Sequence, residues 1–157
     1  QTGTVLTALR PGHFQEKFGD VLGVVLHEGI FPVFASSADT SLPMVATRDI
    51  AEIAVQELLA DTQTSEAVDI VGPEYTERQV ARSLSVVLGK PLEVVPIPEP
   101  GWMKALVEAG FAPHIAESLA DLYRADEQKR LGPRGDRSIR VTTDIDTTVR
   151  HVLAQEV

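Results

Sequence analysis

The chain has 157 residues, 43% of them hydrophobic and 24% charged, a composition typical of one soluble globular domain. Its 14 basic and 23 acidic residues give a formal charge of -9, so the field of the whole protein repels phosphate, and we expect no nucleic-acid or membrane partner. The absence of cysteine excludes disulfides, thiolate catalysis and zinc–cysteine sites. No apolar run is long enough to cross a membrane and no signal pattern opens the chain, so we predict a cytoplasmic protein.

The first segment, Thr4–Leu9, predicts a buried strand, because apolar residues occupy both of its faces apart from threonines. Such a strand is typical of a parallel sheet and needs neighbours. Arg10-Pro11-Gly12 is expected to end it, with a helix beginning near Phe14. Since open α/β sheets bind ligands at the carboxyl ends of their strands, we expect the functional site here. The strand starts so soon after Gln1 that we also expect further chain before it.

Helical spacing of apolar residues continues from Phe14 to Val25, and Gly29 is expected to end that helix. The pattern then breaks, which predicts a loop with a short extended piece over Ile30–Ala46. Thr47 is predicted to cap the next helix. The buried stripe of that helix is expected to consist of Ile50, Ile53, Ala54 and Leu58.

The second half of the chain predicts two more strands and four more helices. Thr76 and Gln79 have the spacing of a capping box, which predicts a helix beginning there and ending at Gly89. Thr143 is predicted to cap the last helix. The remaining predictions are strands at Val68–Val71 and Leu92–Ile97, helices at Trp102–Ala109 and Pro113–Ala125, and a loop at Lys129–Arg140.

Four short motifs occur in a fixed order along the chain. They are Leu9-Arg10-Pro11-Gly12-His13-Phe14, Val45-Ala46-Thr47-Arg48-Asp49-Ile50-Ala51, Val71-Gly72-Pro73-Glu74 and Leu88-Gly89-Lys90-Pro91. As an ordered set they resemble the carboxyl-terminal half of the NmrA-like family, which are atypical short-chain dehydrogenase/reductases with a Rossmann fold. The resemblance covers most of the chain.

This resemblance implies an α/β fold: the carboxyl-terminal part of a Rossmann-like parallel sheet plus a small, mainly helical substrate lobe. We expect one unit over residues 1–157, in which 1–72 form the last part of the Rossmann-like domain and 73–157 the interleaved substrate-side lobe. The family's glycine-rich turn after the first strand is missing, since no G-x-G-x-x-G occurs. The dinucleotide-binding half is therefore expected to be absent from this chain.

The family cleft implies candidate site residues. Pro11, Gly12 and His13 are expected to approach an NADP(H) or NAD(H) cofactor, and His13, Phe14 and Trp102 a small-molecule substrate. Each has an alternative: His13 is a polar residue at a turn, Phe14 packs in the core, and Trp102 is a buried anchor whose N–H is satisfied. The chain alone is not expected to bind the dinucleotide tightly.

No catalytic residue and no metal site is predicted. Arg48 and Asp49 invite a catalytic interpretation, but polarity at a helix start explains them better. The histidines His27, His114 and His151 lack the spacing of metal ligands.

Two functions remain open. The first is the substrate-binding half of an NAD(P)H-dependent oxidoreductase acting on a small carbonyl or quinone-like compound, an enzyme only when the missing amino-terminal half, or a second chain, completes the sheet. The alternative is a non-catalytic dinucleotide-sensing or regulatory binding module. A third arrangement is a homodimer in which the unpaired strand meets a copy of itself.

Overall fold

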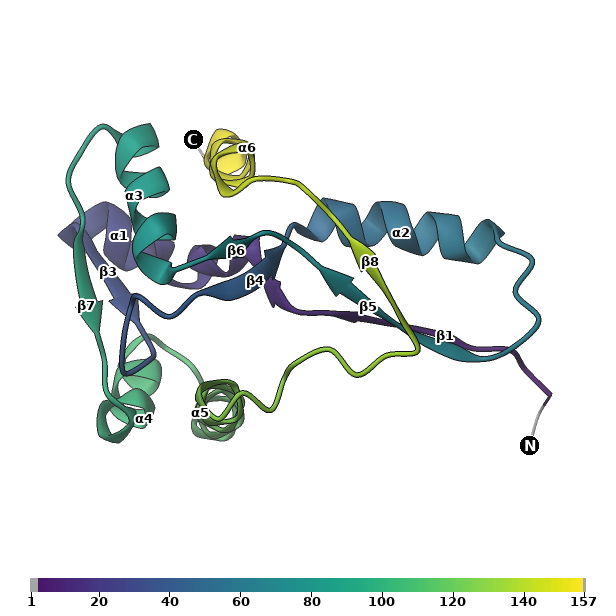
Figure 1. The fold of residues 1–157 in the computed structure, drawn as a ribbon. Helices are drawn as coiled ribbons and strands as arrows, with labels where there is room; N and C mark the ends of the chain where they lie inside the picture. The colour runs from purple at the N-terminus through teal and green to yellow at the C-terminus, as the bar shows by residue number, and fades with distance from the viewer. Residues whose placement is uncertain (1–2, 157) are drawn as a thin grey trace. The chain divides into compact units, whose positions relative to one another are not determined.

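The computed structural model describes residues 3–156, which form two compact units (Figure 1). Unit 1 combines the segment ending at Asp20, the segment Ser41–Tyr75 and the segment from Pro133 onward. Unit 2 combines Val21–Thr40 with Thr76–Gly132. Each unit therefore draws on both halves of the sequence, and the predicted division at residues 72 and 73 stays a prediction.

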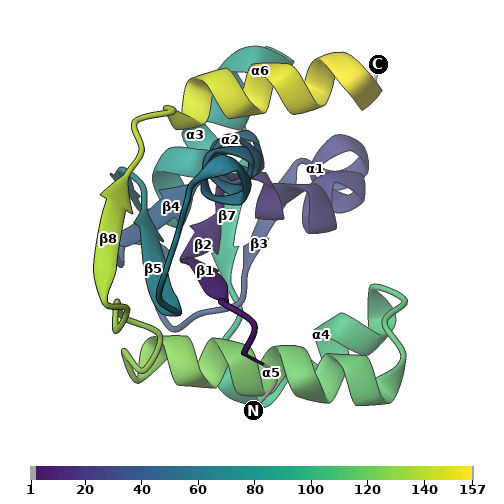
Figure 2. The ribbon, with the colours of Figure 1, turned by 90° about the vertical axis from the view of Figure 1, so that its right-hand side faces the viewer.

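Unit 1 is built on a three-stranded parallel sheet. Its strands are β1 (Thr7–Pro11), β5 (Glu66–Val71) and β8 (Arg137–Arg140), and their spatial order is β1-β5-β8. Figure 2 shows the three strands side by side. Within the described residues, β1 is thus an edge strand that pairs on one side only.

A second small sheet continues from the end of β1. It consists of β2 (His13–Phe14), β4 (Leu42–Val45) and β6 (Glu74–Tyr75), with β4 in the middle. The chain passes from β5 to β6 at Gly72, where an added Cβ would lie 1.9 Å from the backbone oxygen of Met44. Only glycine allows the two backbones to come this close.

The core of unit 1 lies between its sheet and α2 (Thr47–Leu59). Val45, Ile53 and Ile70 are buried there together. The partly buried residues packed against them are Leu9, Ile50, Ile139 and Val141. The last helix of the unit is α6 (Ile145–Glu156).

Unit 2 contains a two-stranded parallel sheet and four helices. Its strands β3 (Ile30–Val33) and β7 (Glu93–Pro96) pair in register. The helices are α1 (Leu22–Glu28), α3 (Glu77–Leu88), α4 (Glu99–Glu108) and α5 (Pro113–Glu127). Both α1 and α3 end at a left-handed glycine, Gly29 and Gly89, as the sequence predicts.

Several sequence predictions are confirmed. The α/β class with a parallel sheet is correct. The strand predicted at Val68–Val71 lies within β5, and the strand predicted at Leu92–Ile97 contains β7. Thr76 and Gln79 form the predicted capping box of α3. These features depend on the chemistry of neighbouring residues, so they can be predicted from the sequence without the tertiary structure.

Other predictions about the extended segments are wrong. The first strand runs over Thr7–Pro11 rather than ending before Arg10, and His13–Phe14 forms β2 instead of opening a helix. A 3₁₀ helix, η1 (Gln15–Val21), follows it. The segment Ile30–Ala46, predicted as a loop with one short extended piece, contains two strands, β3 and β4, and the predicted loop Lys129–Arg140 ends in β8. Each of β3, β4 and β8 has only four residues, and their residues show too little periodicity to be distinguished from a loop.

Three predictions about helix residues are also wrong. Thr47 does not cap α2, because Ala46 holds the cap position and makes no side-chain bond there. Thr143 does not cap α6: the Asp144 carboxylate accepts a 2.7 Å hydrogen bond from the Thr147 N–H instead. Leu58 does not belong to the buried stripe of α2, since 84% of its surface is exposed.

Candidate ligand site

The predicted site segment Pro11–Phe14 carries the chain from one sheet of unit 1 to the other. Pro11 is the last residue of β1, and the next strand pairs His13 with Met44 in parallel. Between them, a Cβ on Gly12 would lie 3.3 Å from the Pro43 carbonyl oxygen, so a small residue is needed. His13 is half-buried and Phe14 is exposed. The segment therefore stands at the carboxyl end of β1, as predicted.

Gln15 anchors this segment from within unit 1. Its side chain is buried, and its amide nitrogen donates to the carbonyl oxygens of Met44 at 3.2 Å and Thr143 at 2.7 Å. Its amide oxygen accepts a hydrogen bond from the Thr148 hydroxyl at 2.5 Å. One side chain thus joins η1, β4 and α6. The sequence offers no local signal for this role, because the three partners lie 29 to 133 positions away.

The next residue, Glu16, binds the start of α2. Its Oε1 accepts hydrogen bonds from the Thr47 backbone N–H at 2.9 Å and from the Thr47 hydroxyl at 2.7 Å. A carboxylate at this place satisfies an orphan N–H group and favours the positive end of the helix dipole. Glu16 therefore takes the capping role that the sequence assigned to Thr47.

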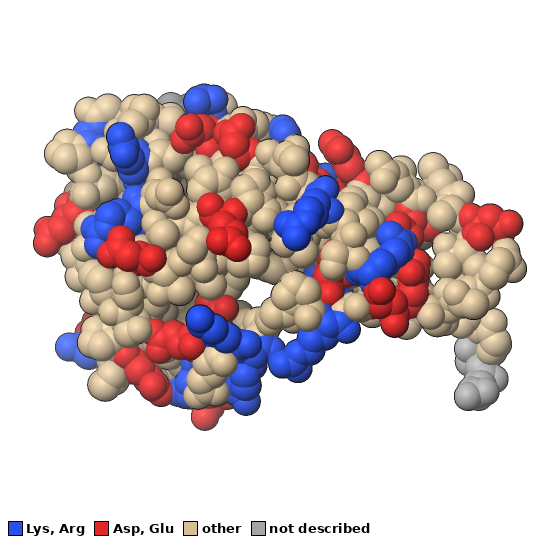
Figure 3. All heavy atoms as spheres, in the orientation of Figure 1, with Lys and Arg blue, Asp and Glu red and all other residues tan. Residues whose placement is uncertain are grey.

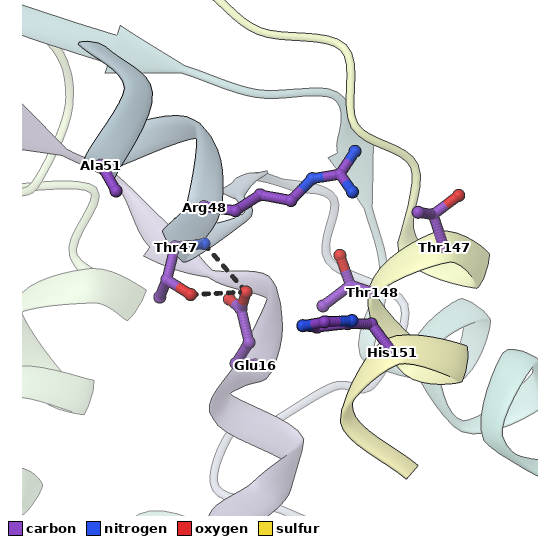
Figure 4. A pocket seen from close by; sticks show the side chains of 7 residues that line it. All are labelled: Glu16, Thr47, Arg48, Ala51, Thr147, Thr148 and His151. Carbon is purple, nitrogen blue, oxygen red and sulfur yellow. Dashed lines mark hydrogen bonds between the residues drawn. The ribbon is translucent and has the colours of Figure 1, made fainter. Parts of the chain in front are cut away.

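A cavity of about 250 Å³ lies beside this contact, wholly within unit 1. Figure 4 shows the His151 ring extending from α6 toward Glu16, and the Arg48 side chain extending from α2 toward the side of Thr147. The lining residues are Glu16, Thr47, Arg48, Ala51, Thr147, Thr148 and His151. Sequence reasoning missed Glu16 as a site residue and treated His151 only as a potential metal ligand.

Two side chains that line the cavity, Arg48 and His151, contact neighbouring polar side chains. The Arg48 guanidinium donates to the Thr143 hydroxyl at 3.1 Å, and that hydroxyl donates to Asp49 at 2.7 Å. The His151 ring lies 3.1 Å from the amide nitrogen of Gln155. These bonds fix helix starts and side-chain positions, and none of them pairs a nucleophile with a general base.

Trp102 lies in unit 2 and is fully buried. Its indole N–H donates to the Ile97 carbonyl oxygen at 2.6 Å. Tyr123 meets it edge-on at 5.8 Å between ring centroids, and Phe34 stacks on Tyr123 at 5.4 Å. The structure thus places His13 and Phe14 in unit 1 and Trp102 among aromatic rings of unit 2. Their assignment to cofactor or substrate stays a prediction.

No group of three or more His, Asp or Glu residues in residues 3–156 is arranged to hold a metal ion. None of the described helices is both long enough and apolar enough to span a membrane.

Comparison with curated proteins shows similarity to reductases and dehydrogenases. The chain is 25% identical over 124 residues to the NAD(P)H azoreductase of Xenophilus azovorans, which covers 78% of this chain and 43% of that protein. It is 30% identical over 132 residues to the agroclavine dehydrogenase of Claviceps purpurea, covering 80% of this chain and 45% of the relative. The chain thus spans less than half the length of these relatives. No protein-family model matches it.

Solved structures share its fold. The NADPH-dependent quinone oxidoreductase of Escherichia coli aligns with a TM-score of 0.73 at 21% identity, covering 96% of this chain and 56% of that protein. The triphenylmethane reductase of Citrobacter sp. aligns with a TM-score of 0.76 at 23% identity, covering 94% and 53%. The chain therefore has the α/β fold found in these Rossmann-like reductases, over about half of their length.

Proposed function

We propose that this chain is the substrate-side half of an NAD(P)H-dependent oxidoreductase that reduces a small carbonyl or quinone-like compound. The observation that carries the proposal is similarity over about four-fifths of the chain to a reductase and a dehydrogenase, of which the aligned region covers less than half. The glycine-rich phosphate-binding turn is absent from the sequence. We therefore infer that the dinucleotide-binding half lies outside residues 1–157, either in another part of a longer chain or in a second chain.

The position of Pro11–Phe14 supports this role. Parallel α/β sheets bind ligands outside the carboxyl ends of their strands, and β1 ends at Pro11. Gly12 already brings two backbones close together. Gln15 holds the segment to β4 and α6, so its geometry does not depend on a ligand.

In this proposal the nicotinamide supplies the hydride when it is bound. The residues of this chain bind and orient the acceptor. The His13 side chain stands at the strand end as a hydrogen-bond donor for the acceptor oxygen, and the exposed Phe14 ring contributes apolar surface for a flat substrate.

A titration of NADPH tests the placement of the cofactor site. We expect no saturation at micromolar NADPH with the chain alone. A longer protein that carries the chain together with a glycine-rich half is expected to bind NADPH and oxidise it in the presence of menadione, a small quinone. Micromolar NADPH binding by the chain alone would refute the placement. NADPH binding by the longer protein without turnover, for any quinone or carbonyl tried, would favour the regulatory module.

A further inference from the structure

The cavity of about 250 Å³ in unit 1 opens between η1, the first turns of α2 and the first turns of α6. Figure 4 shows Glu16 and Thr47 on one side of this space and Thr148 and His151 on the other. Thr148 is buried, whereas the Arg48 and His151 side chains are exposed. The buried side chain therefore lines the inner part of the cavity, and the two exposed ones line its mouth.

Most polar groups of the lining are already engaged with protein partners. The hydroxyls of Thr47, Thr147 and Thr148 donate to carboxylate or amide oxygens of Glu16, Asp144 and Gln15. The Glu16 Oε1 atom accepts a second hydrogen bond, from the Thr47 N–H, and the Oε2 atom is buried. The one carboxylate of the lining thus presents little to a ligand, and a cationic ligand would find no good acceptor in it.

Arg48 is the lining side chain with donors to spare. A guanidinium has five N–H groups, and within residues 3–156 this one donates a single hydrogen bond, to the Thr143 hydroxyl at 3.1 Å. Its Nε atom lies 3.8 Å from the Asp49 carboxylate, beyond hydrogen-bond distance, and 55% of its side chain is exposed. A free guanidinium edge of this kind matches the two oxygens of a carboxylate.

The net charge of -9 opposes an anionic ligand, so the local contact has to outweigh it. At about 0.1 M salt, exposed charges more than roughly 10 Å apart are largely screened, and the Arg48 contact acts at much shorter range. Glu16 remains close to the ligand. A carboxylate with one negative charge is therefore a better ligand than a phosphate, which carries a larger charge.

The rest of the lining suits an apolar body. The His151 ring offers a flat aromatic surface on one side of the cavity, and the Ala51 methyl group lines it from α2. The volume lies just below the range of about 300–1,000 Å³ found for small-molecule pockets, so the ligand is small.

We propose that this cavity binds a small aromatic carboxylate. Arg48 holds the carboxylate group, and the aromatic ring lies against His151 and Ala51. None of the lining residues belongs to the candidate segment Pro11–Phe14, and the proposal does not rest on the proposed function.

Nuclear magnetic resonance of the isotope-labelled chain with sodium benzoate as the probe tests the site. We expect saturable shifts of the Arg48 Nε–H and Ala51 N–H signals. Benzyl alcohol, which has the same ring without the charge, and inorganic phosphate are expected to cause no saturable shift. Absence of saturation with benzoate, or equally tight binding of benzyl alcohol or phosphate, would overturn the proposal.

Variants of Arg48 test the charge contact. Arg48→Gln is expected to weaken benzoate binding about tenfold or more, because a hydrogen bond to a charged group contributes at least this much. Arg140→Gln, at an exposed arginine of β8 outside the lining, is the control and is expected to leave the affinity unchanged. Should Arg48→Gln fail to fold, Arg48→Lys decides: it retains the charge without the planar fork and is expected to weaken binding about threefold. Unchanged affinity in the folded Arg48 variant would contradict the contact.

Filling the cavity tests the location independently of charge. Ala51→Leu places a larger side chain in the lining and is expected to abolish saturable benzoate binding. Gln56→Leu, at an exposed position of the same helix outside the lining, is expected to retain it. Benzoate binding that survives Ala51→Leu would place the ligand elsewhere and reject the site.

Discussion

Close backbone packing at Gly72 makes this residue a determinant of unit 1. A Cβ here would lie 1.9 Å from the Met44 carbonyl oxygen and 2.6 Å from its carbon, which are backbone atoms that cannot rotate away. We expect Gly72→Ala to lower the free energy of unfolding by about 3 kcal/mol. Urea unfolding measures the change. Gly132→Ala, where no atom lies within 4 Å, is the control and is expected to change stability by less than about 0.5 kcal/mol.

The amide of Gln15 is a second determinant at the scale of one residue. Gln15→Leu would leave the carbonyl oxygens of Met44 and Thr143 without this donor and the Thr148 hydroxyl without this acceptor. We expect a loss of about 2–4 kcal/mol in unfolding free energy, because buried polar groups would lose their partners. Differential scanning calorimetry measures the loss of stability. The control is Gln56→Leu, which changes an exposed residue of α2. Equal effects of the two substitutions would contradict the role of Gln15.

At the scale of elements, the start of α6 depends on Asp144. Its carboxylate accepts hydrogen bonds from the Thr147 N–H at 2.7 Å and the Thr147 hydroxyl at 3.1 Å. Asp144→Ala is expected to cost about 1 kcal/mol of stability, and Asp144→Asn, which retains a capping oxygen, less than half of that. Chemical denaturation measures the unfolding free energy of both variants. The comparison distinguishes loss of the capping hydrogen bond from loss of the negative charge. A similar loss in both would favour the charge effect.

A cluster of three charged side chains links β5, β8 and α2. Arg137 of β8 donates to Glu66 of β5 at 2.9 and 3.0 Å and to Glu57 at 2.8 Å. Figure 3 shows basic and acidic side chains interspersed over these strands. The hydrogen bond from Arg137 lowers the pKa of Glu66, and the Thr147 N–H lowers the pKa of Asp144. In unit 2, the hydrogen bond from Arg78 lowers the pKa of Asp39.

These shifts predict that acid lowers the stability of the fold. A carboxyl group whose pKa is lower in the folded state than in the unfolded state stabilises the fold. This contribution is fully present above the ordinary pKa, which is 3.8 for Asp39 and Asp144 and 4.5 for Glu66. It is lost as the pH falls through the lowered pKa of the folded state. We therefore expect the melting temperature to be flat near neutral pH and to fall below about pH 4.5. Arg137→Gln is expected to reduce the slope of this fall. A slope equal to that of the unchanged protein would show that Glu66 does not contribute.

At the scale of the whole molecule, we expect the open side of β1 to affect how the chain associates. The sheet order leaves this strand without a described partner on one side, next to the exposed apolar face of α2. We expect the isolated chain to self-associate or to bind a hydrophobic dye, and Leu58→Glu with Leu59→Glu to reduce either behaviour. Light scattering and dye fluorescence measure the change. A monomer that binds no dye before the substitution would show that the surface needs no cover.

Local residue chemistry and coarse apolar pattern were enough to predict part of the fold. The capping box at Thr76, the left-handed glycines Gly29 and Gly89 and the apolar strand after Glu66 are each visible within a few residues. The ordered motifs also indicated a resemblance to reductases, and the proteins similar to this chain include an NAD(P)H azoreductase.

Only the tertiary structure decided which residues meet across the chain. Gln15 joins residues up to 133 positions away, and Glu16 caps a helix that begins 31 positions later. Leu58 follows helical apolar spacing but faces outward, because α2 is apolar on two sides and the pattern alone does not say which side meets the sheet. Periodicity reports that a face is apolar, and only the arrangement of strands and helices in space reports what covers it.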